Sequence, residues 1–155
     1  MSPLGRKVLM WMIPVNLLML VWVWIGRIAF GVGGWFFLIM LYALPFLFLA
    51  LLATTLMGFL IGSDRPRALT RAQALAQLAM WAAMAAFGFF IVDFGDAPES
   101  DLSVFTQLVG RNDATLSLSW TLTAISGGIV IAAWVILLVL LLAQRRSHRA
   151  ALAAA

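Results

Sequence analysis

Four long apolar stretches, separated by short polar or glycine-rich segments, set the pattern of the chain. Each is close to or longer than the roughly 20 helical residues that a ~30 Å hydrocarbon core requires. The pattern therefore predicts an all-α integral membrane protein, a single domain in which four transmembrane helices form a bundle. The predicted spans are Val8–Ile25, Trp35–Ile61, Ala72–Val92 and Leu116–Ala143.

The composition excludes an ordinary soluble domain. Hydrophobic residues make up 65% of the 155 residues and charged residues 10%, whereas soluble domains average about 45–50% apolar and ~25% charged residues. A chain with so few polar residues cannot cover itself with a water-facing surface. We expect membrane lipids to cover the remainder.

The first apolar stretch has a second interpretation, as a secretory signal peptide. Arg6 and Lys7 form a basic start, and Ala29-Phe30-Gly31 weakly resembles a cleavage site. The stretch is longer than the apolar region of about 7–15 residues that signal peptides carry, so we favour a membrane span.

The segments between the spans carry recognisable boundary signals. The glycine-rich segment 26–34 predicts a tight turn after the first span, and Gly62 to Pro66 ends the second. Thr70-Arg71-Ala72-Gln73 matches a capping box, which predicts that the third helix begins near Thr70.

The only sizeable polar segment, residues 94–114, joins the third and fourth spans. Apolar residues recur in it at helical spacing, with Ser100 or Asp101 as the expected N-cap and Gly110 as the stop. This predicts a short interfacial helix whose apolar side faces the bundle or the headgroups while Asp101, Ser103 and Gln107 face water. The apolar residues are Leu102, Phe105, Leu108 and Val109.

Basic residues gather on one side of the four-span arrangement. That side holds eight of the ten, whereas the other holds Arg27 and Arg111 together with five of the six acidic residues. Because short basic loops resist translocation, both termini and a basic tail, residues 144–155, should be cytoplasmic. The excess of arginine, nine against one lysine, suggests that the protein is bacterial. We therefore expect a multi-pass protein of the plasma (inner) membrane. The eight residues are Arg6, Lys7, Arg65, Arg67, Arg71, Arg145, Arg146 and Arg149.

Arg27 and Asp93 are the innermost charges of opposite sign at the outer ends of spans one and three. We expect them to form an ion pair if the two helix ends are neighbours. The alternative is that Arg27 extends toward the headgroups and that each residue makes its own contact there.

Asn16 is the most polar residue well inside the first span, two positions after Pro14. Proline frees a backbone carbonyl in a helix, so Asn16 could bond that carbonyl or a neighbouring helix. The rival interpretation is a contact with a substrate. We favour the structural role.

The fourth span carries Ser119, Thr123 and Gly127 at successive i+4 positions, with Ser126 beside them. One face of its outer half is therefore small and polar. Such a face can line a pore, but close packing of another helix is the commoner meaning.

The sequence contains no catalytic, cofactor-binding or metal-binding pattern. It has no cysteine, and its one histidine, His148, stands in the basic tail without an acid or a nucleophile nearby. Four acidic residues between Asp93 and Asp101 could attract Ca²⁺, but their spacing is not that of an EF-hand. We therefore expect no enzyme, and the scattered basic residues argue against nucleic acid as a partner.

Two functions remain. The first is an accessory, assembly or regulatory subunit of a membrane complex, because the chain has a helix bundle without a charged relay through its core. The second is a homo-oligomeric channel, small-molecule transporter or holin-like pore, in which several copies would assemble a polar path. The direction of the polar side chains in the spans discriminates between them: Asn16, Thr54, Thr55, Thr123 and Ser126.

The charge asymmetry predicts the topology directly. Reporters fused at residue 2 and residue 155 should both register the cytoplasm, and a reporter inserted between Asp96 and Arg111 should register the outside. A carboxyl terminus found outside would contradict the four-span arrangement.

Overall fold

The computed structural model of the chain describes residues 3–60, 67–96 and 100–153. Within these ranges, four helices are long and apolar enough to cross a membrane, and the described residues include no extended strand. The predicted all-helical fold is therefore confirmed. The helices are α1 (Pro3–Trp24), the short 3-10 helix η1 (Gly26–Phe30), α2 (Trp35–Leu60), α3 (Arg71–Phe90), α4 (Val104–Val109) and α5 (Asp113–Ala153).

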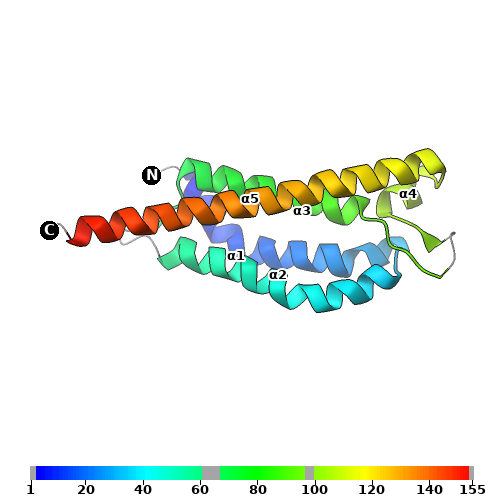
Figure 1. Ribbon diagram of the computed structural model, residues 1–155, viewed down its shortest axis with the longest axis horizontal. Helices are drawn as coiled ribbons and strands as arrows, with labels where there is room; N and C mark the ends of the chain where they lie inside the picture. Colours follow the sequence, from blue (N-terminus) through cyan, green and yellow to red (C-terminus); the bar gives the residue numbers. More distant parts are fainter. Residues whose placement is uncertain (1–2, 61–66, 97–99, 154–155) are drawn as a thin grey trace.

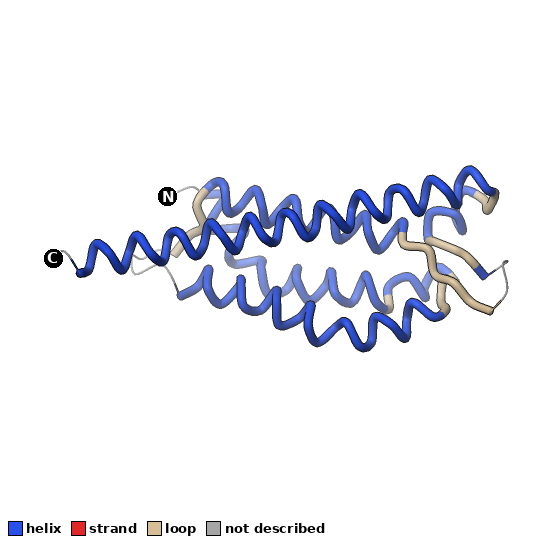
Figure 2. Tube along the Cα trace, in the orientation of Figure 1, coloured by secondary structure: helices blue, strands red, loops and turns tan. Residues whose placement is uncertain are grey.

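The four long helices run side by side along the longest axis of the molecule (Figure 1). Both chain ends lie at one end of the bundle, whereas α4, the neighbouring η1 and the loops around them form the other end (Figures 1 and 2). α3 packs most extensively on α5, α1 packs on α3, and α2 packs mainly on α1. We call the end with η1 and α4 the loop end and the opposite one the terminal end.

Two groups of buried apolar side chains fill the bundle. The first lies toward the terminal end and comes from α1, α3, α5 and the residue before the α3 cap. The second lies nearer the middle and includes Leu51, which α2 contributes. Burying apolar surface that would otherwise face water stabilises a fold by about 25 cal/mol per Å². Where the surface would otherwise face lipid, the stabilisation comes from the packing of the side chains. The first group is Val8, Leu9, Met12, Leu69, Ala74, Leu137 and Leu141, and the second is Leu20, Leu51, Met80, Met84 and Ala133.

Proline shapes two of the long helices. Pro14 lies inside α1 and Pro45 inside α2. Each removes one backbone hydrogen bond and crowds the preceding turn, so a helix bends there. α2 is bowed in Figure 1, with its middle set away from the rest of the bundle.

Most predicted boundaries agree with the helices, and the differences have a simple cause. α1 begins at Pro3 rather than Val8, and α5 runs over Asp113–Ala153, beyond the predicted 116–143 at both ends. Hydropathy marks only the apolar part of a helix, whereas backbone hydrogen bonding continues into flanking polar turns. The capping box at Thr70 is confirmed by both of its hydrogen bonds.

The helix in the loop begins later than predicted. Its N-cap is Ser103, which forms a capping box with Thr106, so neither Ser100 nor Asp101 is the cap. Ser103 is fully buried rather than water-facing, while Leu108 and Val109 are exposed. The helix ends at Gly110 as expected, with φ 104°.

Some predicted features lie outside the described residues. They are the end of the second span at Ile61, the link Gly62 to Pro66 with Arg65, and Glu99 in the loop. The side chains of His148 and Arg149 are also outside the description.

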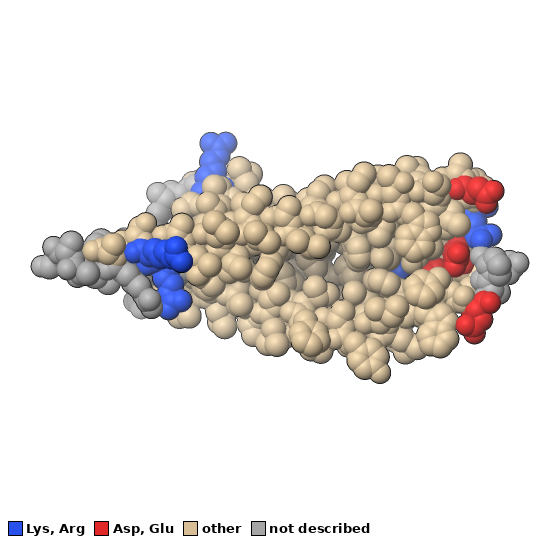
Figure 3. Space-filling view, viewed as in Figure 1, with Lys and Arg blue, Asp and Glu red and all other residues tan. Residues whose placement is uncertain are grey.

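The described charges separate between the two ends of the bundle (Figure 3). Lysine and arginine side chains gather at the terminal end, and the acidic side chains of the view lie at the loop end beside a few basic atoms. The asymmetry along the sequence is thus an asymmetry in space.

The turn between η1 and α2 approaches the loop after α3 very closely at Gly34. A Cβ atom added to Gly34 would meet the Phe94 carbonyl oxygen and would lie 2.7 Å from Asp93 Oδ1. A Cβ added to the neighbouring Gly33 would meet no described atom within 4 Å. The close approach therefore requires glycine at 34 and not at 33.

Gly34→Ala should lower the free energy of unfolding by about 1–3 kcal/mol, because the obstructing atom is backbone and cannot turn aside. Gly33→Ala is the matched control and should leave stability nearly unchanged. Thermal unfolding of both variants in one detergent measures the difference. Equal melting temperatures for the two would contradict the close approach.

Candidate functional site

Arg27 lies in η1, directly after α1, and its side chain is buried with 1% exposure. Its Nη2 lies 3.1 Å from Oδ2 of Asp93, which follows α3 and is equally buried. The predicted ion pair is confirmed. Because both partners are removed from solvent, the alternative of two independent headgroup contacts is wrong.

The remaining donors of Arg27 are directed at the ends of two helices. Nε donates to the carbonyl of Val23 over 3.2 Å, and Nη1 donates to the carbonyl of Ile91 over 3.4 Å. The guanidinium also lies over the Phe36 ring, 4.7 Å from its centroid, in cation–π geometry. Burial lowers the pKa of Arg27, while the charge and hydrogen bond of Asp93 act to raise it. An arginine so paired stays protonated at neutral pH.

The second oxygen of Asp93 serves a different partner, the start of α2. Oδ1 accepts hydrogen bonds from the backbone N–H of Phe36 at 2.9 Å and from that of Phe94 at 3.1 Å. Trp35 N donates to the Phe94 carbonyl over 2.8 Å. The first N–H groups of a helix have no partner within it, and a carboxylate there is favoured by the helix dipole. Asp93 therefore caps α2 from a distant part of the chain.

Asp93 also fixes the loop that follows it. Its N–H donates to the Leu102 carbonyl over 2.7 Å, and Leu102 N donates back to the Asp93 carbonyl over 3.0 Å. Arg27, Asp93 and the backbone of Phe36 and Phe94 form what we call the outer cluster. It joins α1, α2, α3 and the loop before α4 at one point.

A second polar group, the amide cluster, lies between α1, α2 and α3 and consists of Asn16, Thr55, Gln77 and Trp81. Asn16 Nδ2 donates to Thr55 Oγ1 over 3.1 Å, and its Oδ1 accepts from Gln77 Nε2 at 3.1 Å and from Trp81 Nε1 at 2.7 Å. Thr55 in turn donates to the Leu51 carbonyl over 2.7 Å. Asn16 thus bonds neighbouring helices, as the structural interpretation of this residue expected.

Trp81 fixes the direction of every bond in the amide cluster. An indole N–H is a donor only, so the Asn16 atom facing it must be the carbonyl oxygen. The amide nitrogen of Asn16 must then face Thr55, and Gln77 must also present its nitrogen to Asn16. The Gln77 oxygen consequently points elsewhere, and it accepts no hydrogen bond from any described residue although it is fully buried.

Gln77 and Trp81 are members of this cluster that the sequence analysis missed. Gln77 is the one amide inside the third span apart from the capping residue Gln73. An amide in an apolar span needs a partner, and Asn16 in the first span supplies one. Pairing the two isolated amides is the signal that would have found the contact. Gln73 makes a comparable bond closer to the terminal end, donating from Nε2 to Gln144 Oε1 over 2.8 Å.

The small polar face of α5 serves packing and local bonding. Ser119 Oγ lies 2.6 Å from Ser103 Oγ, which joins α5 to the cap of α4. Thr123 donates to the Ser119 carbonyl over 2.8 Å, and Ser126 donates to the Leu122 carbonyl over 2.6 Å. The hydroxyls of Thr123 and Ser126 thus bond their own helix, whereas that of Ser119 bonds the cap of α4.

The outer and amide clusters both hold helices together. Within the described ranges, no three histidine or acidic side chains are grouped so that they could hold a metal ion. Nearly every polar atom of the outer and amide clusters already has a partner, and the charged pair is shielded from solvent. The two clusters act as contacts that hold the helices in register.

Comparisons with known proteins find no matching family model, no similar curated protein and no solved structure of similar fold.

The outer cluster predicts strong coupling between its two charges. Arg27→Gln and Asp93→Asn should each cost about 3–5 kcal/mol, because each leaves a buried charge without its partner. The double variant should lose clearly less than the sum of the two single variants. A double-mutant cycle by thermal or denaturant unfolding, in detergent and in lipid, measures the coupling, and strict additivity would count against direct contact.

The amide cluster predicts unequal effects of removing its two amides. Asn16→Leu leaves the Trp81 indole and the Gln77 amide without their acceptor, whereas Gln77→Met leaves Asn16 bonded to Trp81 and removes an oxygen that has no described partner. Asn16→Leu should therefore be about 1–2 kcal/mol more destabilising than Gln77→Met. Unfolding of both variants in the same detergent tests this, and equal losses would overturn the assigned bond directions.

Proposed function

We propose that this chain is an accessory, assembly or regulatory subunit of a membrane complex. The observation that carries the proposal is a contrast within the bundle. The buried polar side chains of the spans are bonded to one another or to backbone, apart from the Gln77 oxygen, whereas the long apolar helix α2 is left largely uncovered by the rest of the chain.

The polar side chains that could line a solute path have other partners. Thr54 and Thr55 donate to carbonyls of their own helix, as do Thr123 and Ser126, and Asn16 is bonded to three neighbours. A pocket of about 450 Å³ beside α2 is lined by apolar side chains and Trp134. These arrangements favour a packed subunit over a pore formed by one copy.

α2 offers the surface for a partner. All of its residues are described, and three of them are buried, Leu51, Thr54 and Thr55. Exposed residues recur along α2 at alternating intervals of four and three residues. This spacing is typical of helices that pack on another helix in a left-handed coiled coil. The residues of this stripe are Trp35, Ile39, Tyr42, Phe46, Leu49, Ala53, Leu56 and Leu60.

We further propose a multi-pass plasma membrane protein of bacterial type, with both termini in the cytoplasm. Support comes from the four apolar helices, from the chain ends lying together at the terminal end, and from the basic side chains gathered there (Figures 1 and 3). Short basic segments are retained in the cytoplasm.

The test is purification of the tagged chain from its own membranes in mild detergent, followed by native mass spectrometry. We expect one foreign membrane protein at fixed stoichiometry. The variant Tyr42→Ala/Leu49→Ala should lose it, whereas Met10→Ala/Leu18→Ala, which removes exposed apolar bulk from α1, should keep it. A homo-oligomer without a foreign chain would instead support the channel, transporter or holin-like alternative.

A further inference from the structure

α1 and α2 contact each other near the loop end and again near the middle of α1, and they separate between these two contacts. Toward the loop end, Trp24 stacks on Phe37 with ring centroids 5.4 Å apart, and its Nε1 donates to the Phe37 carbonyl. Toward the terminal end, Asn16 bonds Thr55. Pro45 lies in the intervening part of α2, a helix that is bowed in Figure 1.

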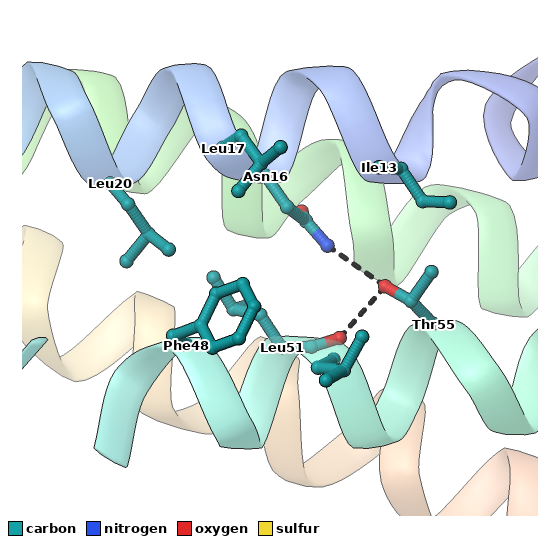
Figure 4. A pocket seen from close by; sticks show the side chains of 8 residues that line it. Ile13, Asn16, Leu17, Leu20, Phe48, Leu51 and Thr55 are labelled. Atoms are coloured by element: carbon teal, nitrogen blue, oxygen red, sulfur yellow. Dashed lines mark hydrogen bonds between the residues drawn. The ribbon is translucent and has the colours of Figure 1, made fainter. Parts of the chain in front are cut away.

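The space between these two contacts is an apolar groove. It comprises a pocket of about 210 Å³ and a pocket of about 390 Å³, which share Leu17, Leu20 and Phe48 as lining residues. Figure 4 shows the first pocket, with the side chains of α1 and α2 facing each other across it. Its two polar lining residues are Asn16 and Thr55, and their bond to each other and to the Leu51 carbonyl is drawn there.

The groove opens sideways, toward the medium that surrounds the helices. Ile13, Leu17 and Val21 on one rim are about half exposed, as are Leu41 and Phe48 on the other. Such a lining offers water almost no hydrogen bonds, so water does not fill it favourably. A hydrocarbon chain fits both the lining and the lateral opening.

One face of α1 leads from the groove to a positive charge. Arg6, Met10, Ile13, Leu17 and Val21 recur at helical spacing, and all five are exposed. Arg6 lies about 10 Å along the helix from Ile13 and about 16 Å from Leu17, at 1.5 Å per residue. One leaflet contributes about 15 Å of hydrocarbon. An acyl chain whose headgroup lies at Arg6 therefore reaches the near end of the groove, at Ile13, within its own leaflet, and ends close to the level of Leu17.

The charge at that end selects the headgroup. Arg6 lies near the start of α1, at the end of the bundle where basic side chains gather (Figure 3). A lipid headgroup of net negative charge gains roughly 1 kcal/mol per basic residue near the surface. We propose that an anionic phospholipid of the bilayer binds here, with its phosphate at Arg6 and one acyl chain between α1 and α2. This goes beyond the proposed function and rests only on residence in a membrane.

The experiment measures lipid binding to the purified chain by native mass spectrometry, with phosphatidylglycerol and phosphatidylcholine of identical acyl chains. The wild-type chain should retain one phosphatidylglycerol in preference to phosphatidylcholine. Leu17→Trp, which fills the groove, should abolish this retention. Leu18→Trp places the same bulk on the neighbouring exposed position outside the groove and should leave it unchanged.

The headgroup is tested by a second matched pair. Arg6→Gln should weaken phosphatidylglycerol binding about fivefold, the equivalent of roughly 1 kcal/mol, whereas Arg145→Gln, which removes an exposed charge at the same end, should not. Leu17→Ala enlarges the groove and should retain the lipid, which separates blocking from misfolding.

Three outcomes would overturn the proposal. They are equal retention by Leu17→Trp and Leu18→Trp, equal binding of the two lipids, and equal weakening by Arg6→Gln and Arg145→Gln. Because no partner protein is present in these measurements, their failure leaves the test of the subunit proposal untouched.

Discussion

The Asp93 carboxylate is the constraint on which the loop end of this bundle depends. One of its oxygens neutralises the buried Arg27, and the other accepts hydrogen bonds from the N–H of Phe36, in the first turn of α2, and from that of Phe94. A carboxylate carries a full negative charge and accepts several hydrogen bonds at once. An amide or a hydroxyl is neutral and could not both balance the charge of Arg27 and accept these bonds. Since α1, α2 and the loop before α4 all converge on this side chain, their relative positions are decided at one residue.

The amide cluster complements this arrangement deeper in the bundle. The outer cluster fixes where α2 begins, and Asn16 fixes α2 again through Thr55. Between these two anchors α2 contributes little to the core, with Leu51 as its member of the buried groups. The chain therefore combines a well-packed trio of α1, α3 and α5 with a fourth helix held mainly at separated points. That division leaves the middle of α2 free to meet lipid or protein.

Much of this could be predicted from sequence, and the failures share a cause. The spans and the Thr70 capping box follow from local patterns, and the Arg27–Asp93 pair follows from two charges left alone at the same membrane boundary. The partners of Asn16 did not follow, because Gln77 and Trp81 meet it only after three helices pack. The prediction of the α4 cap failed for a similar reason. The cap is Ser103 and not Ser100 or Asp101, and Ser103 is buried against Ser119 of α5.

The indole of Trp81 also sets the electrical polarity of the amide cluster. A proton relay works only if each group in the row can exchange its donor and acceptor roles, so that the row resets after a transfer. Trp81 cannot accept, and Asn16, Gln77 and Thr55 are therefore held in a single arrangement of dipoles running from α3 through α1 to α2. The row has no reversed form of equal energy, so its hydrogen bonds keep one direction across the three helices.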